Sequence, residues 1–197
     1  LNEGFAQFIQ YLILRDYMTE FDKNFDVWEM CASVVGVVSL TFYKKGIIAP
    51  RDTNIKISFK RIFNYVLYCK GPFVLKMFYD IIGEEQFIEI CTKYLEKFKN
   101  KSVVISDFIS VVDSILDKSY FSFFDAWLYN VGFPVLFVKE TEYDEENKVI
   151  KGIEIEMHSN KDVDFKFNVP ILYRKNRKYF EKVVSFVDQK VCNVDLD

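Results

Sequence analysis

Apolar residues recur at helical spacing through the first two thirds of the chain. Because a helix turns once every 3.6 residues, apolar positions three or four apart gather on one face and can be buried together. Five segments show this repeat: 5–13, 73–81, 84–98, 108–116 and 121–128. We therefore predict that residues 1 to about 130 are mainly helical.

Signals for helix ends accompany this pattern. Gly83 is expected to end one helix, and Glu84 and Glu85 are expected to open the next, since acidic side chains are favoured in a first turn. Ser106 is expected to cap the helix that follows. The predicted buried face of the 84–98 helix consists of Phe87, Ile90, Cys91, Tyr94, Leu95 and Phe98.

The period of the pattern changes after Gly132. Runs with apolar residues in a short block or at every second position are found at 135–138, 153–157 and 165–169. Such runs are typical of strands, and the acidic and polar residues 140–148 between the first two are expected to form a hairpin or loop. Alternation with one polar face predicts an antiparallel sheet that is open to solvent on one side. The sequence therefore predicts an α+β fold.

Composition indicates a packed globular protein and argues against two kinds of partner. Half of the 197 residues are hydrophobic, and the 21 Phe and 12 Tyr supply large apolar areas for a core. The formal net charge is −3 and no basic stripe is present, so we expect no nucleic-acid binding. The longest apolar stretch, 34–42, is about half the length needed to cross a bilayer, and no membrane segment is expected within the chain.

Metal-binding and redox-active residue types are sparse. None of the four cysteines forms a C-x-x-C pair, and we expect buried, reduced thiols, which favours a cytoplasmic location. A membrane anchor upstream of the chain stays open, since the chain begins with Leu1 rather than Met. The single histidine, His158, continues a strand pattern and has no second histidine to share a metal with.

Three short motifs follow one another in order along the chain. The first is L-N-E-G-F-A at 1–6, the second is Y-C-K-G at 68–71, and the third is W-L-Y-N-V-G-F-P-V at 127–135. Their order and spacing over residues 1–138 resemble the M1 family of zinc aminopeptidases, the gluzincins. Residues 139–197 match only through their strand pattern.

This resemblance implies roles for two residues. Glu3 of N-E-G-F-A would be a zinc ligand, and a catalytic zinc typically takes three protein ligands and keeps a fourth position for water. Tyr68 of Y-x-K-G would be catalytic, because a phenol aimed at the tetrahedral oxyanion donates a hydrogen bond that strengthens as charge develops. The implied cofactor is one Zn²⁺ ion, and the implied partners are peptide substrates with a free N-terminus.

Other interpretations of these residues stay open. Glu3 is also a first-turn acid that would satisfy the helix dipole, and Tyr68 is also a candidate core tyrosine in an aromatic stretch. Tyr65 is close in position but lacks the following Lys-Gly. Tyr43 also begins Y-x-K-G but lies too close to Glu3 for the spacing of the family. Pro72 follows the motif where the family usually has a small residue, which puts the local backbone in question.

The remaining parts of the family's site have no counterpart here. The H-E-x-x-H helix, which would supply two zinc ligands and the general base, would fall about twenty residues before Glu3 and thus before Leu1. The G-x-M-E-N segment that holds the substrate amine is also absent. We therefore expect an interior fragment, incomplete and inactive alone.

The resemblance implies two domains: residues 1–131 would be the helical part of the catalytic domain, and residues 132–197 would begin an incomplete antiparallel β-sandwich. The expected function of the parent protein is zinc-dependent hydrolysis of N-terminal residues from peptides. The alternative is a non-catalytic M1-like scaffold, although retention of both Glu3 and Tyr68 argues against it. The sequence does not indicate an oligomeric state.

Overall fold

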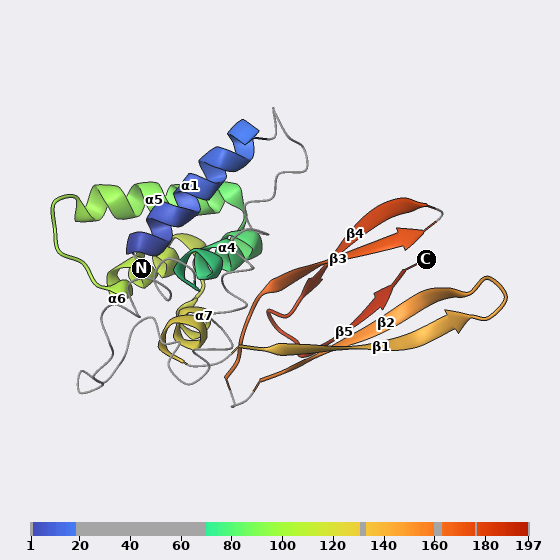
Figure 1. Ribbon diagram of the computed structural model, residues 1–197. Helices are drawn as coiled ribbons and strands as arrows, with labels where there is room; N and C mark the ends of the chain where they lie inside the picture. Colours follow the sequence, from blue (N-terminus) through green and yellow to red (C-terminus); the bar gives the residue numbers. More distant parts are fainter. Residues whose placement is uncertain (1, 19–69, 131–132, 160–162, 176, 197) are drawn as a thin grey trace, which may run out of the picture. The chain divides into compact units, whose positions relative to one another are not determined.

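The computed structural model of the chain describes residues 2–18, 70–130, 133–159, 163–175 and 177–196 (Figure 1). The chain divides into two units, Leu1–Gly132 and Phe133–Asp197. In the described residues the first unit is helical and the second contains only strands and their connections. The predicted α+β fold class is confirmed.

Within 2–18 and 70–130 the helices follow the predicted pattern, and residues 19–69, for which helix was also predicted, lie outside the described residues. The elements of the helical unit are α1 (Asn2–Met18), α4 (Gly71–Ile82), α5 (Glu84–Phe98), α6 (Ile105–Leu116) and α7 (Phe121–Phe124), which continues into the π-helical turn η2 (Asp125–Tyr129). Gly83 separates α4 from α5 at a φ of 87°, and its N–H donates to the Tyr79 carbonyl at 2.8 Å. A residue without Cβ takes this conformation at no steric cost. Glu84 and Glu85 form the first turn of α5, as predicted.

The prediction that Ser106 caps α6 is wrong. The helix begins at Ile105, so Ser106 already lies inside its first turn. The carboxylate of Asp107 reaches back and accepts a hydrogen bond from the Val104 N–H at 2.8 Å, while the Asp107 N–H donates to the Val104 carbonyl at 3.1 Å. An acidic side chain three residues into a helix can thus define its start without a polar residue at the cap.

Aromatic side chains make up most of the core of this unit. The rings of Phe8 and Phe87 lie 5.2 Å apart edge to face, and those of Phe78 and Phe124 lie 5.0 Å apart. The rings of Phe78 and Phe87, 6.4 Å apart, link these two pairs, so one aromatic cluster joins α1, α4, α5 and α7. The buried face predicted for α5 is wrong at Leu95, which is 68% exposed because it lies at the edge of the apolar stripe.

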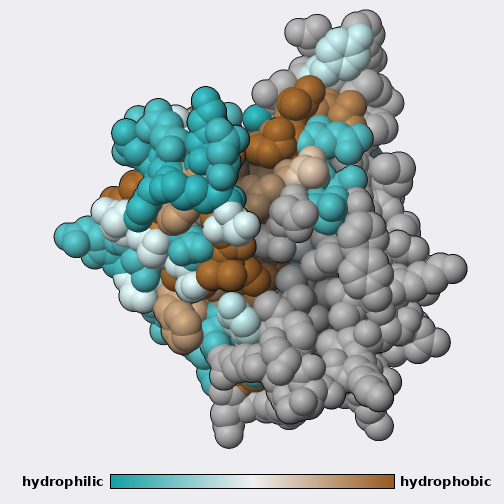
Figure 2. All heavy atoms as spheres, turned by 90° about the vertical axis from the view of Figure 1, so that its left-hand side faces the viewer, coloured by the Kyte–Doolittle hydropathy of each residue, from teal (hydrophilic) through white to brown (hydrophobic). Residues whose placement is uncertain are grey.

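Some apolar side chains of the helical unit remain at its surface. Ile9, Ile13 and Tyr17 are exposed on α1, as is Ile88 on α5. Figure 2 shows apolar areas between hydrophilic ones on one face of the molecule. No helix within the described ranges is both long enough and apolar enough to span a bilayer.

The second unit contains two antiparallel sheets. Strands β1 (Val135–Asp144), β2 (Val149–His158) and β5 (Val191–Asp195) form one sheet in the order β1-β2-β5. Strands β3 (Asn168–Lys175) and β4 (Lys178–Ser185) pair in the other (Figure 1). The expected hairpin is present, but β1 runs to Asp144 and the turn is shorter than the polar segment suggested.

Alternation along β2 has the predicted consequence. Ile153, Ile155 and Met157 are buried, while Glu156 between the last two is exposed. Phe165 and Phe167 are also buried, but they precede β3 in a segment that is not part of a strand. The apolar period there reflects burial rather than strand pairing.

Candidate metal and catalytic site

Glu3 lies in the first turn of α1, with its side chain half-buried. A carboxylate at this position is favoured by the helix macrodipole whether or not it binds a metal. The position alone therefore does not separate the two roles considered for Glu3.

Gly4 is buried against Gly71, the first residue of α4. A Cβ atom placed on Gly4 would lie 2.9 Å from the carbonyl carbon of Gly71 and 3.0 Å from its Cα. These separations are shorter than the van der Waals contact of two carbon atoms. The two backbones can approach this closely only because neither residue has a side chain. The N-E-G-F-A motif and the end of the Y-x-K-G motif are thus in direct contact, although Gly71 follows Gly4 by 67 residues.

Tyr68 lies outside the described residues, as do Tyr65 and Tyr43. The structure begins again at Lys70, two residues after Tyr68 in the chain. The Lys70 amine donates to the Asn130 carbonyl at 3.4 Å, which links the motif to the residue just after η2. Burial lowers the pKa of the Lys70 amine to about 8.

Pro72 is compatible with the local structure. It is the second residue of α4, where a helix has no intrahelical acceptor for a backbone N–H. Pro72 therefore fits the first turn of α4.

His158 has a structural environment of its own. It lies at the end of β2, with Nε2 2.9 Å from a carboxylate oxygen of Glu156 and its ring edge-on to Phe137. Across the described part of the chain, no three His, Cys, Asp or Glu side chains gather in a way that could hold a metal ion. Within those residues Glu3 is one carboxylate donor of the kind that zinc accepts, and the rest of a ligand set is not among them.

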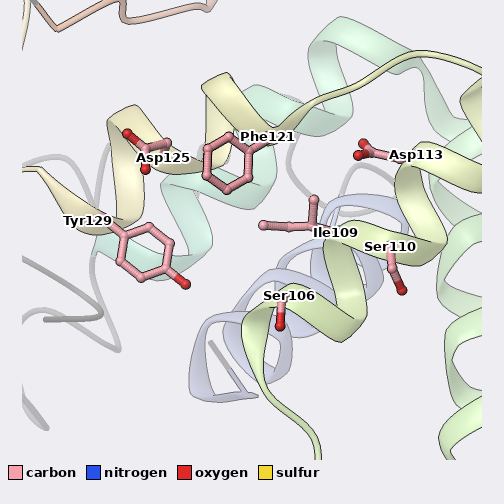
Figure 3. Close-up of a pocket in the computed structure, with 7 residues that line it drawn as sticks. All are labelled: Ser106, Ile109, Ser110, Asp113, Phe121, Asp125 and Tyr129. Atoms are coloured by element: carbon pink, nitrogen blue, oxygen red, sulfur yellow. The ribbon is translucent and has the colours of Figure 1, made fainter. Parts of the chain in front are cut away.

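An open pocket that the sequence did not indicate lies between α6 and the α7–η2 segment (Figure 3). It has a volume of about 640 Å³ and is lined by Ser106, Ile109, Ser110, Asp113, Phe121, Asp125 and Tyr129. Its carboxylates hold the chain: Asp113 accepts from the Tyr120 N–H at 2.8 Å, and Asp125 accepts from the Asn130 amide at 3.3 Å. The available sequence signal was the polar series Ser106, Ser110 and Asp113 along one side of α6. Glu3 is not among the lining residues.

Comparison with known proteins identifies the class. The model of the "Peptidase family M1 domain" matches residues 1–127. Alanine/arginine aminopeptidase of Saccharomyces cerevisiae is 30% identical over 142 residues, which are 71% of this chain and 16% of that protein. Glutamyl aminopeptidase of Homo sapiens is 25% identical over 181 residues, covering 89% of this chain and 18% of the relative.

A solved structure shows the same fold. It is Legionella pneumophila aminopeptidase A in complex with aspartic acid, with a TM-score of 0.53 and 22% identity, over 69% of this chain and 16% of that one. The helices of the first unit lie almost entirely within the residues that match the M1 domain. The chain belongs to peptidase family M1, and the resemblance stated from its motifs is confirmed. It spans 16–18% of the length of the two relatives described.

Proposed function

We propose that the protein containing this chain is a zinc-dependent aminopeptidase that hydrolyses N-terminal residues from peptides. One observation carries the proposal: the backbone contact between Gly4 and Gly71, which joins the motif of Glu3 to the end of the motif of Tyr68 in a member of the M1 family. The relatives are named as aminopeptidases, which supports peptides with a free N-terminus as substrates.

The M1 family is generally metal-dependent, and Glu3 is the residue of this chain that we assign to the metal. Its half-buried carboxylate is a suitable zinc donor, and the packing of Gly4 restrains the backbone that carries it. Bound zinc supplies Lewis-acid chemistry at the scissile carbonyl. The remaining ligands would come from outside this chain.

Tyr68 is assigned the electrophilic role. When water adds to a peptide carbonyl, negative charge develops on the carbonyl oxygen, and a phenol O–H donated to that oxygen stabilises it. We assign residues 1–131 to the helical part of the catalytic domain and residues 132–197 to the start of a β-sandwich domain.

The test uses the protein expressed from its complete open reading frame and aminoacyl-anilide substrates. Tyr68→Phe removes one hydroxyl and keeps the ring, so zinc content should stay unchanged while kcat falls roughly 10²- to 10³-fold, the usual cost of one oxyanion donor. Glu3→Ala should lose zinc and activity together, because a vacated ligand position weakens the metal site.

Tyr65→Phe is the matched control and should leave kcat within about threefold of wild type. A Tyr68→Phe enzyme with wild-type kcat beside an impaired Tyr65→Phe enzyme would show that the wrong tyrosine had been assigned. An unmodified protein with no peptidase activity would favour the scaffold alternative.

A further inference from the structure

Gly4 and Gly71 both occupy the starts of helices, where their lack of a side chain has an energetic cost. Glycine loses more backbone freedom on folding than alanine, so a helix is more stable with alanine at most positions. Neither residue has the positive φ that would require glycine. The close approach of the two backbones is therefore the feature that calls for glycine at both positions.

The contact is asymmetric, which makes it open to graded tests. A Cβ on Gly4 would meet three backbone atoms of Gly71, at 2.9, 3.0 and 3.3 Å. A Cβ on Gly71 would meet the Cα of Gly4 at 3.1 Å and its backbone nitrogen at 3.6 Å. All of these are main-chain atoms, which cannot rotate away as the end of a side chain can. An added methyl group must therefore move one helix relative to the other, more at Gly4 than at Gly71.

Other contacts hold both helices in place around this point. Phe5, next to Gly4, packs edge to face on Phe108 of α6 at 5.0 Å between ring centroids. Lys70, next to Gly71, is tied to the Asn130 carbonyl. A shift at the glycine pair is thus resisted on both sides and is transmitted to the first turn of α1, which carries Glu3.

We propose that Gly4 and Gly71 are positioning residues of the metal site, whose backbone contact fixes the Glu3 carboxylate in the orientation that a bound zinc ion requires. This inference rests on the proposed function, because it takes Glu3 as a ligand. Changing a residue that orients a metal ligand typically weakens metal affinity by roughly 10- to 100-fold.

The experiment measures zinc dissociation constants by chelator competition on the complete protein. Gly4→Ala should weaken zinc binding roughly tenfold or more. Gly71→Ala should weaken it less, because its added methyl group makes the longer of the two contacts. Gly152→Ala adds the same methyl group in the β unit, where it meets the Thr141 hydroxyl at 2.7 Å. This matched control should leave the zinc dissociation constant within about twofold of wild type.

A second readout separates positioning from simple destabilisation. Zinc raises the melting temperature of a protein that binds it only when folded. If the glycine pair positions Glu3, the rise in melting temperature on adding zinc shrinks in Gly4→Ala and Gly71→Ala. If the pair only stabilises the fold, the apo and zinc-bound melting temperatures fall together and the rise is unchanged, which overturns the inference.

Failure of the Glu3 assignment and failure of the positioning inference would give different results. If Glu3→Ala binds zinc as wild type does, the assignment of Glu3 is wrong and the proposed function loses its ligand. If Glu3→Ala loses zinc while both glycine variants keep wild-type affinity, only the positioning inference is overturned. The inference expects Gly71→Ala to fold, because a 3.1 Å contact is relieved by a displacement of a few tenths of an ångström. A Gly71→Ala protein that does not fold therefore also counts against the inference.

Discussion

The side-chain amine of Lys70 is buried, which disfavours its charged form. It lies within the Y-x-K-G motif, and burial lowers its pKa from 10.5 to about 8. One of its contacts is a hydrogen bond to the Asn130 carbonyl at 3.4 Å. At neutral pH the folded protein therefore carries a buried positive charge that reduces its stability.

Lys70→Met should stabilise the protein at pH 7 and lose this advantage at high pH. Between pH 8 and 10.5 the unfolded chain holds a proton on Lys70 that the folded chain has released, so stability of the wild type rises with pH across this window. Melting temperatures of both proteins at pH 7 and pH 10 provide the measurement. A difference between the two proteins that stays constant with pH would contradict the buried-charge account.

Among the helices and strands, the sequence was informative wherever a stripe of apolar residues was continuous. The repeats predicted α4, α5 and α6 because each helix has a single buried face, and the alternation in 153–157 predicted β2. Helix starts were harder to predict, since it is the Asp107 carboxylate, and not the Ser106 hydroxyl, that accepts a backbone hydrogen bond at the start of α6, from the Val104 N–H. Leu95 shows the same limit at the edge of an apolar stripe, because it is 68% exposed while the preceding Tyr94 is half-buried.

From the sequence, the candidate site could be predicted only as a set of motifs. Order and spacing linked Glu3 to Y-x-K-G, but glycines carry no periodic signal that could reveal the contact of Gly4 with Gly71. The pocket lined by α6 and the α7–η2 segment was missed for a related reason, because it depends on how those segments face each other.

Phe78 of α4 tests the aromatic core that holds the helices. It is fully buried, and its ring lies 5.0 Å from that of Phe124 and 5.3 Å from that of Tyr120. Phe78→Ala should cost about 3–5 kcal/mol, because it removes a large buried ring and leaves a cavity. The control Leu95→Ala truncates an exposed residue and should cost about 0.5 kcal/mol or less. Thermal unfolding of the complete protein measures both, and equal losses would refute this assignment of the core.

At the scale of the whole molecule, the chain combines two units with different contributions. The helical unit carries the matched part of the M1 domain, residues 1–127, and brings together two of its motifs. The β unit has its own apolar core around Ile155 and Phe186. The chain spans 16–18% of the length of the two relatives described, and among the residues that the structure describes no group of three metal-binding side chains is formed.

The most direct test of the account is the position of the metal itself. Anomalous diffraction at the zinc absorption edge, on crystals of the complete protein, locates the ion independently of activity. The account predicts a zinc peak about 2.0–2.2 Å from a carboxylate oxygen of Glu3, the usual length of such a bond. A zinc ion with a full set of ligands that does not include Glu3 would contradict it.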